Sequence, residues 1–227
     1  MAVRSGHAPG GQQRVPQQGR ARLTVEKILA AAVNILVEDG LPGLNTNRVA
    51  ERAGVNISTL YSYFPDKLAI LRELGSRFQE KRTIFIEERG PELAAGADWA
   101  AWFTMLVDRM VLFRLEEPGG LAIRQASLAT PELRYLDEAS TDRVTDAKVP
   151  GLMAHCPSMD KDQACLVART TTEISTALLD RAFQETPYDA GQIAELKRAL
   201  IAYLATYLDP PPVAPPSTPR RTRKRNT

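Results

Sequence analysis

The sequence of 227 residues is poor in the residue types on which disulfide frameworks and metal centres depend. It contains two cysteines and two histidines, too few for the disulfide scaffold of a small secreted fold. No segment approaches the roughly 20 consecutive apolar residues of a membrane-spanning helix, and the first apolar stretch follows a polar leader that does not resemble a secretory signal. We therefore expect a cytoplasmic protein that has no membrane partner.

The small net charge of +2 hides an uneven distribution of charge along the chain. Residues 1–21, rich in Gly, Gln and Pro, are expected to form a disordered basic leader, and 209–227 a disordered, Pro-rich basic tail. Basic ends of this kind favour a polyanionic partner through counterion release. The alternative is a solvated run of charge without a partner.

Between these ends, apolar residues recur with the period of α-helices, and no segment shows the sustained alternation of a strand. Residues typical of helix ends divide the pattern into separate helices. The expected starts are Thr24, Asp98, Thr130–Pro131, Asp160 and Asp189. The expected stops are Gly40, Gly90–Pro91 and Pro150–Gly151. The predicted helices cover 24–39, two short segments within 46–64, 66–88, 98–117, 121–129, 130–150, 160–185 and 189–208. The predicted fold class is all-α.

Residues 46–64 have the pattern of a helix-turn-helix. Ala50 is small enough for a second helix to approach, Gly54 can adopt the left-handed turn conformation, and Leu60 can fill the angle between the helices. Thr46 and Asn56 are the expected caps of the two helices. An ordinary helix pair of a bundle is the alternative, but it does not explain two tyrosines, at 61 and 63, on a helix surface.

Over residues 22–75 the sequence resembles the tetracycline-repressor (TetR) family of regulators. The segments that carry the resemblance are Val49–Val55 and Thr59–Lys67. It implies an N-terminal helix-turn-helix DNA-binding domain, at 22–68, and a C-terminal helical domain for ligand binding and dimerisation, at 69–208. The family also implies a ligand-responsive repressor, less often an activator, whose ligand moves the fourth helix. The alternative is a helical DNA-binding or interaction protein without an effector.

The resemblance and the docking geometry of such modules together predict the DNA contacts. The second helix lies in the major groove, so its N-terminal side chains face base edges and its tyrosine hydroxyls face phosphates. Arg20 and Arg22 are either a flexible arm in the adjacent groove or part of a solvated leader. The predicted DNA-binding residues are Thr46, Arg48, Asn56, Ile57, Ser58, Thr59, Tyr61, Ser62, Tyr63 and Lys67.

The C-terminal half is expected to supply a dimer interface, because a palindromic operator in double-stranded DNA requires a two-fold homodimer. We predict that helices 160–185 and 189–208 pair with their copies through the stripes 167/171/174/178/182 and 193/196/200/203/207. The alternative is that both stripes close the core of one chain. Apolar walls with a few polar groups are typical of a ligand pocket; our candidate lining residues are Trp102, Met110, Phe113, Gln125, Tyr135 and Glu173.

Neither an enzyme nor a metal site is expected. The sequence offers no Ser/His/Asp set and no phosphate-binding glycine loop. His155, Cys156 and Cys165 are too few and too widely spaced for a zinc site. We expect no metal and no cofactor, apart from a small-molecule effector whose identity the sequence does not give.

Overall fold

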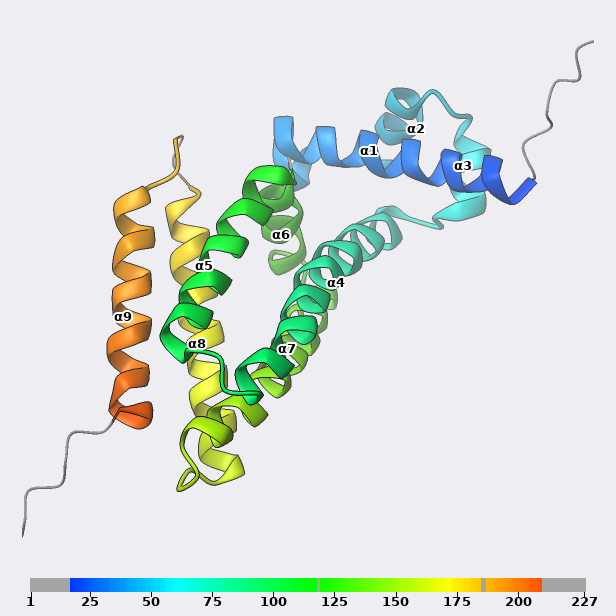
Figure 1. Ribbon diagram of the computed structural model, residues 1–227. Coiled ribbons are helices and arrows are strands. Elements are labelled where there is room, and N and C mark those ends of the chain that lie inside the picture. The colour runs from blue at the N-terminus through cyan, green and yellow to red at the C-terminus, as the bar shows by residue number, and fades with distance from the viewer. Residues whose placement is uncertain (1–16, 118, 185–186, 210–227) are drawn as a thin grey trace, which may run out of the picture. The chain divides into compact units, whose positions relative to one another are not determined.

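The computed structural model describes residues 17–117, 119–184 and 187–209, with the side chains of 17 and 18 left aside (Figure 1). Every regular element in this part of the chain is helical, which confirms the all-α prediction. The described residues form two compact units, one comprising those up to Glu80 together with those of Glu117–Asp137, the other comprising Lys81–Glu116 together with those from Glu138 onward. The division falls within α4 and α7. The predicted boundary at 68/69 stays a prediction.

The first unit begins with α1 (Gln17–Gly43), a longer helix than predicted. Residues 17–21, expected in the leader, are helical, while 1–16 lie outside the described residues. Thr24 is not a cap, because its hydroxyl donates to the Arg20 carbonyl at 3.0 Å, as in a helix interior. The predicted stop at Gly40 is confirmed in part: its φ of 64° kinks the chain, and a short helical piece follows.

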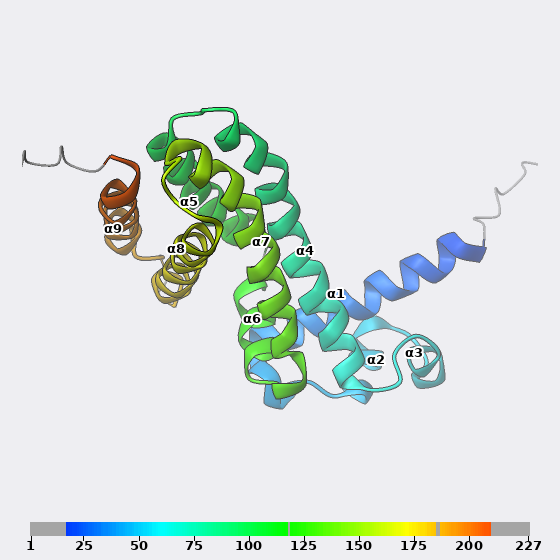
Figure 2. The same ribbon diagram turned by 90° about the horizontal axis from the view of Figure 1, so that it is seen from below.

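The helix-turn-helix consists of α2 (Thr46–Ala53) and α3 (Ile57–Tyr63), joined by a short turn (Figure 2). The long helix α4 (Lys67–Ala94) follows and is capped by Asp66, whose carboxylate accepts from the Ala69 N–H at 2.7 Å. Within the first unit, Arg77 of α4 pairs with Glu26 of α1 at 2.7 Å and thereby joins these two helices. This hydrogen bond raises the pKa of Arg77, so the guanidinium stays charged.

The predicted stops at Gly90–Pro91 and Pro150–Gly151 are wrong, because α4 continues to Ala94 and α7 (Arg134–His155) passes through Pro150. Both glycines serve close helix packing instead. A Cβ on Gly90 would lie 2.5 Å from the Ala147 carbonyl oxygen, and one on Gly151 would lie 2.4 Å from Leu93. Tertiary contact between α4 and α7 therefore explains these glycines better than a turn does.

The remaining helices follow the predicted order. They are α5 (Trp99–Glu116), α6 (Gly120–Leu128), the 3-10 turn η1 (Pro131–Leu133), α8 (Lys161–Ala182) and α9 (Ala190–Leu208). The caps Asp98, Asp160 and Asp189 are confirmed, each accepting a backbone N–H three residues ahead at 2.6, 2.8 and 2.9 Å. Thr130 precedes η1, but its hydroxyl donates to the Ala126 carbonyl of α6 and does not cap.

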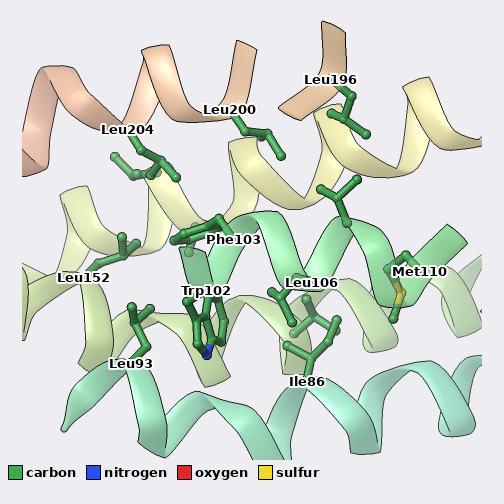
Figure 3. Close-up of a cluster of buried hydrophobic side chains, with 14 of the residues drawn as sticks. Ile86, Leu93, Trp102, Phe103, Leu106, Met110, Leu152, Leu196, Leu200 and Leu204 are labelled. Atoms are coloured by element: carbon green, nitrogen blue, oxygen red, sulfur yellow. The ribbon is translucent and has the colours of Figure 1, made fainter. Parts of the chain in front are cut away.

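The core of the second unit gathers apolar side chains from five helices, α4, α5, α7, α8 and α9 (Figure 3). One face of α5 is largely buried there: Trp102, Phe103, Leu106 and Met110 are at most 7% exposed. The indole of Trp102 meets its hydrogen-bonding need by donating to the Arg89 carbonyl at 3.1 Å. This core surrounds the cavity described below.

Candidate nucleic-acid interface and cavity

The turn between α2 and α3 depends on Gly54. Its φ of 64° and ψ of 35° lie in the left-handed region, as predicted. The Gly54 N–H donates to the Glu51 carbonyl at 3.1 Å and the Val55 N–H to the Ala50 carbonyl at 3.0 Å. These two bonds are a Schellman cap, which ends α2 and turns the chain into α3.

A small core fixes the position of α3 in the first unit. Leu60 and Val49 are completely buried, and Ala50 is 3% exposed. The predicted cap Asn56 is confirmed, since its side chain accepts from the Ser58 N–H at 2.9 Å. The cap of α2, however, is Asn45 rather than Thr46: the Asn45 side chain accepts from the Arg48 N–H at 2.9 Å, and Thr46 lies one residue inside the helix.

The hydroxyl of Thr46 points across to α3, where it lies 3.1 Å from the phenol oxygen of Tyr61. Tyr61 is 48% exposed and Tyr63 is 37% exposed, so both rings are at the surface. If Thr46 donates in this pair, the Tyr61 O–H proton remains for an outside acceptor. The two helices thus hold one phenol in a fixed place at the surface, where a phosphate oxygen can accept from it.

The other predicted α3 residues also lie at or near the surface. Ser58 and Ser62 are exposed, and Ile57 and Thr59 are half-buried. The Ser58 hydroxyl donates to the Asn56 side chain at 3.0 Å, and the Ser62 hydroxyl donates to the Thr59 carbonyl at 2.7 Å. Because both protons are used internally, these oxygens remain as hydrogen-bond acceptors, suited to the amino groups of adenine and cytosine.

The predicted cationic contacts differ in their surroundings. Lys67 is exposed and is the first residue of α4, where the helix N-terminus adds attraction for phosphate. Arg48 instead forms an ion pair with Asp39 at the end of α1, so its charge is partly compensated. Arg20 and Arg22 lie within α1, so the alternative of a flexible arm is wrong for these two residues.

A cavity lies within the second unit and has a volume of about 40 Å³. Eight of its lining residues are apolar, and Figure 3 labels Ile86, Phe103, Leu106, Met110 and Leu200 among them. They come from α4, α5, α7, α8 and α9: Ile86, Phe103, Leu106, Val107, Met110, Val144, Leu179 and Leu200. Spaces between the helices of a bundle are among the places where small molecules bind in proteins.

The polar lining of the cavity is basic or carries hydroxyls: Arg82, Arg114, Lys148, Thr172, Ser175 and Thr176. Lys148 is 4% exposed, and its amine donates to the hydroxyls of Thr172 at 2.8 Å and Thr171 at 3.3 Å. Burial, assisted by the positive charge of Arg82, lowers the pKa of Lys148 to about 7. Arg114 donates to the carboxylate of Asp180 at 2.7 Å.

Among the six predicted pocket residues, the structure brings Met110 to this cavity. Trp102 and Phe113 are buried elsewhere in the packing, while Gln125, Tyr135 and Glu173 are exposed side chains that do not line it. Sequence reasoning missed Arg82 and Lys148. A signal was present, because Lys148 falls four residues after Val144 and four before Leu152, on an apolar stripe of its helix.

The predicted interface stripes of α8 and α9 contribute mainly to the core of the single chain, which was the alternative stated for them. Val167, Thr171, Ala182, Ile193, Leu196 and Leu200 are buried in this core. Ile174, Leu178, Tyr203 and Tyr207 are half-buried. The exposed face of this helix pair is formed instead by residues such as Leu166 and Ala177 on α8 and by Ala199 and Ala202 on α9.

Within the described residues, no group of three or more His, Cys, Asp or Glu side chains is arranged to hold a metal ion. His155 ends α7, the Cys156 thiol lies 3.3 Å from the Ser158 hydroxyl, and Cys165 lies in α8. None of the helices seen in this part of the chain has the length and apolar character needed to cross a bilayer.

The fold and the turn geometry define a helix-turn-helix protein with a second helical unit. Comparison with protein families identifies the family to which the chain belongs. The model of the bacterial regulatory proteins of the tetR family matches residues 28–74. The model of the tetracyclin repressor-like C-terminal domain matches residues 98–204. The chain therefore belongs to the TetR family, as its sequence motif predicted.

Individual relatives agree with this assignment. The HTH-type transcriptional repressor DrrR1 of Streptomyces coeruleorubidus is 32% identical over 114 residues, which cover 50% of this chain and 40% of that repressor. The chain thus aligns with well under half of the length of this curated relative.

Solved structures share the fold over most of their length. A TetR-family regulator of Mesorhizobium loti has a TM-score of 0.65 at 18% identity, covering 84% of this chain and 97% of that one. The regulator FadR of Bacillus subtilis, solved with stearoyl-CoA, has a TM-score of 0.60 at 19% identity, covering 79% and 96%.

Proposed function

We propose that the chain is a transcriptional repressor that acts in the cytoplasm as a homodimer on a palindromic operator in double-stranded DNA. The observation that carries the proposal is the surface of α3: Tyr61 and Tyr63 are exposed beside Ser58 and Ser62, on a helix that Gly54 and Leu60 hold in place. The match of residues 28–74 to the tetR family model supports it.

Dimerisation follows from the geometry of the operator, since one helix-turn-helix covers one half-site. We place the interface on the exposed face of α8 and α9, which carries Leu166, Ala177, Ala199 and Ala202. Figure 2 shows the two helices side by side, so their outer faces can pair with a second copy as a four-helix bundle.

We further propose that a small molecule controls DNA binding from the cavity, with no other cofactor. The cavity supports this proposal over the alternative of a protein without an effector, whose second unit would be filled. The helix α4 begins at Lys67, a proposed phosphate contact, and includes Arg82 and Ile86, which line the cavity. A ligand that favours one position of α4 would shift the equilibrium between DNA-binding and non-binding arrangements.

The test is to select fragments of the source genome with the purified protein and to titrate the enriched sequence by fluorescence anisotropy. We expect an inverted repeat bound by one dimer, with a preference of at least about a thousandfold over unrelated DNA. The variant Ser62→Ala should retain binding with altered base preference, whereas Tyr61→Phe should weaken binding to all sequences. Equal affinity for every duplex would overturn the proposal.

A further inference from the structure

We propose that the cavity of the second unit binds an organic anion, a slender apolar body with one negatively charged head group that Lys148 holds. The inference deepens the proposed function, because such a molecule would be the effector. The binding itself takes place within one unit and requires no DNA.

The first argument is the charge of the lining. Three of the side chains that line the cavity are basic, and none of the described lining residues is Asp or Glu. The charge of Arg114 is balanced by Asp180, but Lys148 contacts two uncharged hydroxyls. Burying an ammonium without a carboxylate is costly, and an anionic ligand would supply the missing negative charge.

The second argument is the set of hydrogen-bond donors. The hydroxyls of Thr171 and Thr172 both donate to the Ala168 carbonyl, at 2.8 and 2.9 Å, and the Ser175 hydroxyl donates to the Thr171 carbonyl at 2.6 Å. None of the three hydroxyls therefore has a proton left to offer a ligand, and the Thr171 and Thr172 oxygens accept from Lys148. Lys148 uses two of its three protons on them, and the third is available to an acceptor group in the cavity.

The third argument concerns the body of the ligand. Beyond Lys148 the walls are apolar, with Phe103, Leu106 and Met110 from α5 and Leu200 from α9. The Phe103 ring centroid is 5.8 Å from the Lys148 amine, so polar and apolar surfaces adjoin. Because the cavity of about 40 Å³ is small, a ligand must move side chains to enter it, and a flexible chain can do so more easily than a rigid ring system.

The charge on Lys148 makes this binding dependent on pH. The other charged groups of the cavity lining are Arg82 from α4 and Arg114 from α5, which pairs with Asp180 of α8, while α9 contributes apolar Leu200. Because the pKa of Lys148 is lowered to about 7, part of the protein holds a neutral amine at neutral pH. An anion favours the protonated form, so binding above pH 7 must take up a proton and weaken by up to about tenfold per pH unit.

The experiment is isothermal titration calorimetry of the full chain with hexanoate, octanoate and decanoate, and with the corresponding alcohols hexanol, octanol and decanol. Each titration is repeated with Lys148→Met and with the control Lys197→Met, which removes a lysine that pairs with Asp108 and does not line the cavity. We expect at least one carboxylate to bind more tightly than its alcohol. We expect Lys148→Met to weaken that carboxylate about tenfold to a hundredfold, as for a charge-assisted hydrogen bond, and to weaken the uncharged alcohol much less.

Three results would overturn the inference: no carboxylate binds, the alcohols bind as tightly as the carboxylates, or Lys148→Met binds the carboxylates like the parent. Titrations in two buffers of different ionisation enthalpy add a second readout, because they measure proton uptake at pH 8. The proposed function fails separately, by the absence of a preferred DNA sequence, whatever the outcome with carboxylates.

Discussion

Replacing Lys148 with methionine removes a buried amine and keeps an unbranched side chain of similar length. The pKa of this lysine is lowered from 10.5 to about 7, so the folded chain releases its proton far more readily than the unfolded chain. A shift of this size corresponds to a cost of roughly 4 kcal/mol in the free energy of unfolding at pH 7. We expect Lys148→Met to recover most of that cost.

The neighbours of Lys148 tolerate its removal. The hydroxyls of Thr171 and Thr172 accept from the amine, but their own protons go to the Ala168 carbonyl, so no donor is left unsatisfied. Methionine adapts well to irregular apolar space. The substitution therefore removes the cost of a buried charge without a large packing penalty.

The pH dependence of the stability difference between parent and Lys148→Met tests this reasoning more sharply than a measurement at one pH. Between about pH 7 and 10.5 the unfolded chain binds more protons at this site than the folded chain does, so the stability of the parent rises with pH through this range. The variant lacks this contribution. The stability gap between the two proteins should therefore shrink from roughly 4 kcal/mol at pH 7 towards zero near pH 10.5.

The assay is urea unfolding followed by circular dichroism at several pH values, with parent and variant at the same protein concentration because the stability of the proposed dimer would depend on it. The control Lys197→Met, at a partly exposed ion pair with Asp108, should change stability by less than about 1 kcal/mol. A Lys148→Met variant no more stable than the parent at pH 7, or a gap that does not vary with pH, would refute the reasoning.

Three further predictions concern the DNA-binding unit and the dimer. Tyr61→Phe should weaken binding to all duplexes by about 1 kcal/mol, the value of one hydrogen bond; equal affinity of variant and parent in anisotropy titrations would contradict this. Gly54→Ala should lower the free energy of unfolding by about 1 kcal/mol, because its φ of 64° strains a residue with a Cβ although no atom lies within 4 Å of that Cβ; unchanged urea unfolding would count against it. Ala202→Glu, on the exposed face of α9, should raise the dimer dissociation constant by at least about tenfold by placing like charges across a two-fold axis; light scattering that finds an unchanged dimer would place the interface elsewhere.

The helix-turn-helix was predictable because its determinants are local. Gly54, Asn56 and Leu60 act through neighbours a few residues away, and the structure confirms each of their roles. The cap of α2 was predicted at Thr46 instead of Asn45, because the two residues are adjacent and Asn and Thr both cap helices. Only the structure reveals that the Thr46 hydroxyl is directed towards Tyr61 instead.

Local signals failed where tertiary packing used the same residues for another purpose. The pairs Gly90–Pro91 and Pro150–Gly151 look like helix ends, yet both lie inside helices, because their glycines let α4 and α7 approach closely. The apolar stripes in the sequences of α8 and α9 correctly predicted an apolar face on each helix. The sequence alone does not determine whether such a face packs against the same chain or against a second copy.

The cavity could not be predicted residue by residue, because five helices far apart in the sequence contribute to its wall. Three of the candidate lining residues were aromatic, but none of them lines the cavity, and Trp102 packs in the core. The more informative sign was a charge on an apolar helix face, which applies to Lys148 between Val144 and Leu152 and to Arg82 between Phe78 and Ile86. A lysine kept inside a cavity at a cost in stability is a better marker of function than an aromatic stripe.

The most direct measurement of the central claim is an anisotropy titration of the double variant Tyr61→Phe/Tyr63→Phe against the enriched genomic sequence, at several salt concentrations, beside the parent. If α3 presents its phenols to phosphates, the variant should remain folded and dimeric and should lose about 2 kcal/mol of affinity for every duplex. Parent and variant curves that coincide at all salt concentrations would show that this face of α3 does not contact DNA.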